Sequence, residues 1–270
     1  MTNDVVSAED SIRAIVRSHV ESYATGFSDR HLREVDDPEG VLNMKIHNVF
    51  VSALGPEVQY YSALARSLDS SLGNLLEAMA INIGSLFYDI TRHVEGGISK
   101  AQVNHISDIL ESYTRNAKKP EVSDYANSLR TKPAKQEIIH KRKATDYYLH
   151  DKEKDTHHLI ELKIGGDLDN KKARSEKEAI LEQYAILSNS LPKKARITVH
   201  FATAYHPEKN EQKIPASILQ FYSKDELLIG EEFWNFVCKR PNGHEIVADE
   251  YGKSIARLRA FIYVESMCHS

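Results

Sequence analysis

The sequence lacks several features that would place a chain outside the cytoplasm or in a membrane. Its two cysteines, Cys238 and Cys268, lie far apart and belong to no ligand-spaced cluster, so they indicate neither a zinc site nor a disulfide framework. No run of about 18 apolar residues occurs, which excludes a membrane span. The first residues lack the basic start and apolar block of a secretory signal. We therefore expect a protein of the reducing cytoplasm.

The chain also lacks a net positive charge, which would argue against a nucleic-acid partner if its charges were evenly spread. The formal net charge is −4, yet residues 1–114 carry 8 Lys/Arg against 16 Asp/Glu, whereas residues 115–143 carry 9 against 3. Two further basic runs follow, both "KKAR", at 171–174 and 193–196. A phosphate backbone meets a local surface and not the global charge. These runs are candidate DNA contacts, although solvated helix faces and loops commonly look the same.

What is present is the composition of a soluble globular protein, with 41% hydrophobic and 27% charged residues and a length of 270. That length suffices for a sizeable core. No internal repeat or low-complexity tract interrupts it. We expect a single domain over residues 1–270, with a mainly helical part (1–114), a basic loop region (115–143), and an α/β core followed by C-terminal helices (144–270).

The first part shows helical periodicity. Ser7 and Asp10 resemble a capping box, and an apolar stripe follows at helical spacing. A second helix is expected at about 41–54. The stripe of the first helix consists of Ile12, Ile15, Val16, Val20 and Tyr23.

A long helix is expected from Glu57 to Phe87, ended by the "EGG" at 95–97. Ser99 with Gln102 then predicts the capped start of another helix. The basic segment that follows contains two prolines and is expected to be a loop with short helical pieces.

The second part changes from helical to alternating patterns. Residues 144–150 and 158–164 are typical of strands joined by a polar turn, and 195–205 is a third strand with alternating apolar residues. A helix is expected between them at about 171–189, and two more close the chain. This order predicts an α/β fold with a mixed sheet, an antiparallel hairpin and flanking helices. The apolar stripe of helix 171–189 consists of Ala173, Lys177, Ile180, Tyr184 and Leu187.

Three charged residues lie inside the hairpin, where charges are rarely buried unless they are paired or bind a metal. Glu161 and Lys163 point to one face of the sheet and Leu162 to the other, because side chains alternate along a strand. If paired residues have numbers that add up to about 307 or 309, Asp146 faces Glu161 or Lys163. Two adjacent carboxylates repel unless a cation lies between them.

Oxygen ligands of this kind suit Mg²⁺, which keeps several waters and needs few protein ligands. Lys163 can orient or activate one of these waters, and the metal stabilises charge on a phosphate oxygen. The pattern therefore indicates phosphodiester hydrolysis. An ordinary salt bridge on an exposed edge is the alternative, but the apolar neighbours Ile160 and Leu162 and the basic helix that follows favour a site.

Four histidines, His140, His150, His157 and His158, flank the hairpin. A nuclease that uses histidine as a ligand or base is therefore conceivable. Their spacing matches no common ligand pattern, and we expect most of them to be turn residues.

The segment "TDYYLHDKEKDTHHLIELK" resembles the active-site hairpin of the PD-(D/E)XK nucleases, with Thr145 where many of them have proline. More narrowly, "ELKIGGDLDNKKARSEKEAILEQYA" looks like the corresponding segment of TdeIII-type type II restriction endonucleases. "RSLDSSLGNLLEAMAINI" resembles an upstream helix of that family and "FATAYHP" the strand after the basic helix. The order of the four blocks, between about 64 and 240, is more specific than the Glu-x-Lys alone. "GGDLDN" departs from a turn that usually contains proline.

The resemblance implies a restriction-endonuclease-like core with Asp146, Glu161 and Lys163 as catalytic residues. Metal ligands would be Asp146, Glu161, the backbone carbonyl of Leu162 and Glu77, a helical carboxylate that could equally be an ordinary surface residue. DNA contacts are expected from basic residues beside the hairpin and on the next helix: Lys141, Arg142, Lys143, Lys171, Lys172, Arg174 and Lys177.

The resemblance further implies a type II restriction endonuclease that uses Mg²⁺ to cut double-stranded DNA at a short palindrome of the GGNCC kind, as a homodimer. A cognate DNA methyltransferase would protect the host without direct contact. Two alternatives stay open from the residues alone. One is another PD-(D/E)XK DNA nuclease, for repair or junction resolution, and the other is a catalytically silent DNA-binding module.

Overall fold

The computed structural model describes residues 2–36, 49–130, 138–164, 170–206, 214–256 and 259. Contacts within the chain group it into two compact units, each of which is described by itself. One comprises residues 1–83 and 245–270, and the other residues 84–244. Whether they fold as one domain, as the sequence predicts, stays a prediction. None of the helices in the described ranges combines the length and apolar composition needed to cross a bilayer.

The first unit is helical, as predicted. Three apolar residues of the expected stripe, Ile12, Val16 and Val20, are fully buried, and Arg17 of the same helix forms an ion pair of 2.7 Å with Glu250. The helix begins well before Ser7, so the predicted cap at that residue is wrong. Part of the expected helix at 41–54 lies outside the described residues. The helices are α1 (Thr2–Asp36), α3 (Val49–Ser52), α4 (Pro56–Gly84) and α10 (Gly243–Ser254).

The second unit contains a five-stranded mixed sheet in the order β1-β2-β3-β4-β5, which confirms the predicted α/β class. Strand β2 is antiparallel to its neighbours β1 and β3, whereas β3, β4 and β5 run parallel to one another. The strands are β1 (Asp89–Ser99), β2 (Ile138–Asp151), β3 (Thr156–Lys163), β4 (Arg196–Thr203) and β5 (Leu227–Ile229). Its helices are α5 (Lys100–Thr114), α6 (Ser123–Ala126), α7 (Asn170–Ser190), α8 (Ala216–Leu219) and α9 (Glu231–Val237), with short 3-10 turns η2 (Ser128–Arg130) and η4 (Lys224–Glu226).

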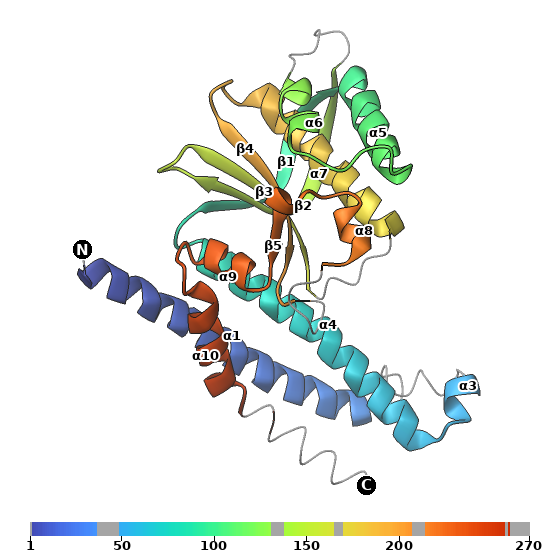
Figure 1. The fold of residues 1–270 in the computed structure, drawn as a ribbon. Coiled ribbons are helices and arrows are strands. Elements are labelled where there is room, and N and C mark those ends of the chain that lie inside the picture. Colours follow the sequence, from blue (N-terminus) through green and yellow to red (C-terminus); the bar gives the residue numbers. More distant parts are fainter. Residues whose placement is uncertain are drawn as a thin grey trace. The chain divides into compact units, whose positions relative to one another are not determined.

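Helix α7 makes the crossover between the parallel strands β3 and β4 and lies on one face of the sheet, with α5 beside it (Figure 1). A parallel pair needs such a crossover, and its helix must bury an apolar stripe on the sheet. Leu159 and Phe201 point from β3 and β4 into this core, and Ile180 and Tyr184 meet them from α7. The face of β3 under α7 is therefore the face that carries Glu161.

Strands β1 and β5 were not expected from the sequence. β1 follows the long helix α4, which ends at Gly84. Strand β2 was expected at 144–150 but begins at Ile138, inside the expected basic loop. Strand β1 depends on its glycines: a Cβ at Gly97 would lie 2.4 Å from the side chain of Ile138, and one at Gly96, with φ of 155°, would lie 2.9 Å from Ile186. Glycine thus permits β2 and α7 to approach β1 closely. The "EGG" at 95–97, which was expected only to end the preceding helix, is therefore part of strand β1.

Other local predictions are confirmed. Ser99 caps α5 in a capping box with Gln102, and the short helical pieces α6 and η2 occur in the basic segment. Helix α7 differs from the expected 171–189 by a single residue at each end.

Candidate active site

The register of the β2–β3 hairpin is the predicted one. Paired residues have numbers that add up to 307, as in Tyr147 with Ile160 and Asp151 with Thr156. Continued by one residue, this register sets Asp146 across from Glu161. The predicted register is therefore confirmed, and this register decides on which face of the sheet Asp146 lies.

The strands stop pairing at this point among the described residues, since Tyr147 with Ile160 is the last pair. Beyond it, the side chain of Asp146 takes the place of the neighbouring strand: its Oδ2 accepts a hydrogen bond of 2.9 Å from the backbone N–H of Leu162. The Leu162 side chain is buried on the other face, as predicted. This contact fixes the Asp146 carboxylate at the open end of the hairpin.

Lys163 lies between two carboxylates. Its Nζ is 2.5 Å from Glu161 Oε1 on the same strand and 3.0 Å from Glu176 Oε1 on α7. The Glu161 side chain is 11% exposed, against 31% for Lys163 and 28% for Glu176. The cluster is thus mostly covered, and the Glu161 side chain is its most buried member.

Glu176 is a residue of this cluster that the sequence analysis missed. It lies three residues after Ala173 and four before Ile180, both of which are buried. A helical residue at that spacing is on the side that faces the sheet. A carboxylate on the buried side of the helix was the signal that could have found it.

The electrostatics of the cluster disfavour the charged form of one carboxylate. Burial, together with the negative charge of Asp146, raises the pKa of Glu161 to about 8 in spite of its ion pair with Lys163. Burial lowers the pKa of Lys163, but its hydrogen bonds and charge interactions with Glu161 and Glu176 outweigh burial and raise it. An acid whose pKa is held this far from its usual value is typical of a functional site.

These residues fit a Mg²⁺ ion by their chemistry. Two carboxylates that repel each other are stabilised by a cation between them, and Mg²⁺ usually takes one or two carboxylates and keeps several waters. Asp146 and Glu161 would supply the carboxylates, and the backbone carbonyl of Leu162 follows Glu161 directly on β3.

Two of the three predicted DNA contacts on β2 form ion pairs within the protein. Lys141 and Lys143 both form ion pairs with Glu182 of α7, at 2.9 and 2.5 Å. Arg142, on the opposite side of the strand, is exposed. These residues belong to strand β2 and pair with β1, and not to the loop that was predicted for them.

The predicted contacts on α7 differ in exposure. Lys171 and Lys172 are exposed at its start, and Arg174 forms an i,i+4 pair of 3.5 Å with Glu178. The prediction that Lys177 contacts DNA is wrong, because its side chain is fully buried. It forms an ion pair with Glu226, so it cannot reach a phosphate.

Glu77 lies on α4, half-buried. Met79 is fully buried, and Leu76 is half-buried. The helix belongs to the unit formed by residues 1–83 and 245–270, whereas Asp146 and Glu161 belong to the other. The role of Glu77 at the metal therefore stays a prediction.

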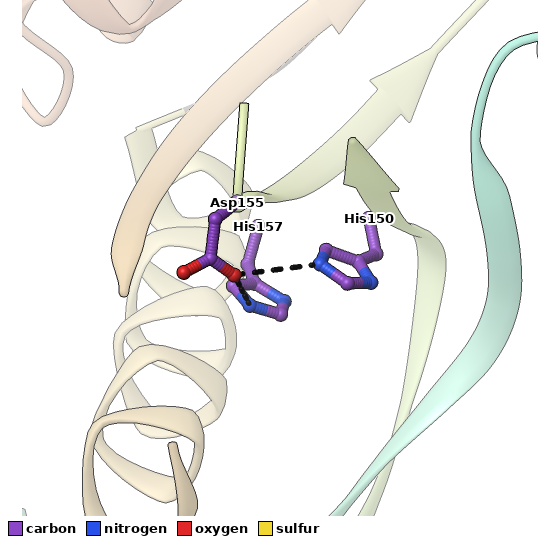
Figure 2. Close-up of side chains that lie close together, drawn as sticks. All are labelled: His150, Asp155 and His157. Carbon is purple, nitrogen blue, oxygen red and sulfur yellow. Dashed lines mark ion pairs between the residues drawn. The ribbon is translucent and has the colours of Figure 1, made fainter. Parts of the chain in front are cut away.

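The histidines near the hairpin are strand residues, which corrects their interpretation as turn residues. His140 and His150 lie on β2, and His157 and His158 lie on β3. His150 and His157 meet Asp155 at the closed end of the hairpin, as Figure 2 shows. The sequence spacing did not reveal this group because its members come from two strands and a turn.

The fold and the site together define a class of protein: an α/β core in which paired strands present two carboxylates and a lysine beside a crossover helix. Comparison with known families agrees with this class. The family described as "Type II restriction endonuclease, HinfI" matches residues 8–254. The chain belongs to this family and is therefore a nuclease. Neither the curated proteins nor the solved structures contain a match.

Proposed function

We propose that the chain cuts double-stranded DNA at a short palindromic site, with Mg²⁺ held by Asp146, Glu161 and the Leu162 carbonyl. The observation that carries this proposal is the convergence of Asp146, Glu161 and Lys163 at the end of the hairpin, where Asp146 hydrogen-bonds to the Leu162 N–H. The three residues have the order and spacing of a PD-(D/E)XK site. The family match supports the same activity at a coarser level.

In this site Mg²⁺ would lower the pKa of a bound water and stabilise the negative charge that forms on the phosphate. Asp146 is already oriented by the Leu162 N–H, so less side-chain freedom has to be lost when it binds the metal. Glu161 has to lose its proton first, since its pKa is raised to about 8. Its release from Lys163 would leave the lysine free to bind another group.

Lys163 would then donate a hydrogen bond from Nζ to the attacking water and orient it toward the phosphorus. Glu176 contacts the same Nζ at 3.0 Å, so it would hold the lysine in place while Glu161 binds the metal. In this scheme Glu176 is a positioning residue. Orientation of a nucleophile by a fixed group is a large part of enzymatic rate acceleration.

DNA would be bound through the basic residues that are not buried. Arg142, Lys171 and Lys172 are exposed, and phosphate contacts by such side chains supply most of the non-specific affinity. A palindromic site calls for a two-fold symmetric protein, so we propose a homodimer. A cognate methyltransferase would protect the host DNA, and Glu77 would join the metal directly or through water.

Digestion of a fully sequenced phage DNA tests the proposal. With Mg²⁺ the chain is expected to give discrete fragments whose mapped ends share one short palindrome, and with a chelator it is expected to give none. The resemblance to TdeIII-type enzymes makes GGNCC the first sequence to test. Cleavage of branched or mismatched DNA alone would instead support a repair or junction nuclease, and binding without cleavage would support a silent DNA-binding module.

A further inference from the structure

The closed end of the β2–β3 hairpin brings two histidines and an aspartate together. His150 and His157 are direct partners across the strands, and their rings stack with centroids 4.2 Å apart. Asp155, in the turn, has a positive φ of 48°, a conformation that aspartate tolerates better than most residues. Figure 2 shows its carboxylate facing both rings, with Oδ1 at 3.8 Å from His150 Nε2 and 4.0 Å from His157 Nε2.

These distances are close to those of a metal site. Two ligands of a tetrahedral ion with bonds of about 2.0–2.1 Å lie roughly 3.4 Å apart. The candidate ligand atoms of His150, Asp155 and His157 all lie within 4.8 Å of one another, which no other three His, Cys, Asp or Glu side chains of the described residues achieve. A small contraction and a rotation of one ring out of the stack would complete the geometry.

The hydrogen bonding around both histidines resembles that of metal-binding histidines. The ring of His157, 6% exposed, has its Nδ1 2.8 Å from the hydroxyl of Tyr148. Metal-binding histidines usually have their second nitrogen held by such an outer partner. His150 Nε2 is buried and has no hydrogen-bond partner among the described residues. A buried polar atom without a partner is costly, and a metal would satisfy it.

We propose that His150, Asp155 and His157 bind a Zn²⁺ ion that clips the turn of the hairpin. Two imidazoles and one carboxylate suit Zn²⁺, with a water as fourth ligand, whereas Mg²⁺ and Ca²⁺ prefer oxygen ligands alone. The site lies four residues along β3 from Glu161, roughly 13 Å at 3.3 Å per residue, so the two sites do not share an ion.

The ion would connect β2, the turn and β3. It would thereby hold the register that places Asp146 across from Glu161, because a slip of one residue would turn Asp146 to the other face. This role is structural and goes beyond the proposed cleavage of DNA. It holds whether or not the chain cuts DNA.

The test uses the full chain, freed of metal with a chelator, and Zn²⁺ alone as the probe, without DNA. The zinc content after desalting, a competition titration with a chromophoric chelator and the unfolding temperature are measured. We expect one Zn²⁺ per chain and a rise in Tm of about 5–10 °C at a free Zn²⁺ concentration 100 times Kd. Excess Mg²⁺ should not displace the Zn²⁺, and Co²⁺ in its place should give the visible absorption of a tetrahedral site.

Two variants remove a ligand with little risk to the fold. Asp155→Asn keeps the shape and tolerates the positive φ, and His150→Gln replaces the less buried ring. Each is expected to weaken Zn²⁺ binding by more than about 100-fold, more than loss of an outer partner causes. His140→Gln, an exposed histidine of the same strand, is the matched control and should bind like the wild type.

Circular dichroism confirms that each variant is folded. A wild-type chain that retains no stoichiometric Zn²⁺ would overturn the proposal. So would folded Asp155→Asn and His150→Gln variants that bind Zn²⁺ within about threefold of the wild type, since the ion would then lie elsewhere.

Discussion

Glu176 and Lys177 are neighbours on α7, yet they belong to two ion-pair clusters of opposite character. Glu176 joins the partly exposed cluster of Lys163 and Glu161, whereas Lys177 forms an ion pair with Glu226 in the core. In the core pair, both side chains are buried to within 1%. The two clusters contain the same kinds of charge but differ in what else surrounds the carboxylate.

Glu226 has every hydrogen bond that it needs. One oxygen accepts from Lys177 Nζ and, at 2.6 Å, from the hydroxyl of Tyr125; the other accepts from the backbone and side chain of Ser223, at 2.8 and 3.0 Å. Burial raises the pKa of Glu226, but Lys177 and these hydrogen bonds outweigh burial and lower it. Lys177 also lies over the ring of Tyr222, at 4.6 Å from its centroid.

Glu161 is in the opposite situation, with Asp146 as a neighbouring like charge and a raised pKa. Burial of an ion pair therefore does not by itself mark a functional site. A satisfied pair is structural, whereas a pair with an uncompensated carboxylate has capacity for a further cation.

The largest expected effect comes from the uncompensated cluster. Asp146→Ala, Glu161→Ala and Lys163→Ala should each lower the cleavage rate by at least about a thousandfold, or about 4 kcal/mol of transition-state stabilisation. Single-turnover digestion measures the rates, and circular dichroism the fold. Glu153→Gln, an exposed carboxylate in the turn of the same hairpin, is the control and should cut normally. Turnover retained in any of the three alanine variants would remove that residue from the site.

Changes to the buried pair of Lys177 and Glu226 should lower the stability of the protein and not its cleavage rate. Lys177→Met leaves Glu226 buried without its cation, which costs about 3–5 kcal/mol. Because the pKa of Glu226 is lowered, its stabilising contribution is present above the unfolded value of 4.5 and is lost as the pH falls below it. Urea unfolding at pH 7 measures the loss.

Two further variants sharpen this prediction. Lys177→Met with Glu226→Leu removes both charges and should regain most of the stability. Glu111→Gln breaks the exposed pair with Arg115 and should change the free energy of unfolding by less than about 0.5 kcal/mol. A Lys177→Met protein that is fully stable but binds DNA poorly would return Lys177 to the DNA surface.

Glu176 offers an intermediate effect that links the two clusters. Glu176→Gln keeps the shape but loses the charge that holds Lys163, so cleavage should slow by about 10–100-fold, as for other supporting residues. The Mg²⁺ dependence should change little, because Lys163 and not the metal loses its partner. Glu178→Gln, on the same helix, is the matched control. Loss of Mg²⁺ affinity in Glu176→Gln would make Glu176 a metal ligand instead.

Glu77 should give the smallest effect. If it joins the metal through water, Glu77→Gln should shift the Mg²⁺ concentration for half-maximal rate several-fold and change the free energy of unfolding by less than about 0.5 kcal/mol. A titration of cleavage rate against Mg²⁺ measures the shift. An unchanged curve would assign Glu77 to an ordinary helix surface.

The sequence predicted what depends on local patterns and missed what depends on packing. The alternating residues of the hairpin gave its register, and the stripe of α7 gave its buried side. That stripe already contained Lys177, so its burial was readable from the same spacing that was used to predict the helix. Its partner Glu226 is far along the chain, which is why the pair itself was not predicted.

Strand β1 was missed because Gly96 and Gly97 interrupt its pattern. These glycines are explained only by the structure, in which β2 and α7 pack closely against them. The group of His150, Asp155 and His157 was missed for a similar reason. Cross-strand partners are set by register, and no ligand motif within one segment contains them.

The most direct test of the central claim measures the Mg²⁺ dependence of cleavage at a series of pH values. Glu161, with a pKa near 8, must lose its proton to bind the metal. The apparent Mg²⁺ affinity should therefore rise about tenfold per pH unit below pH 8 and become constant above it. Glu226→Gln, with its satisfied carboxylate removed, should keep this profile in its folded fraction. An apparent Mg²⁺ affinity that does not change between pH 6 and 8 would contradict the assignment of Glu161 as the uncompensated ligand.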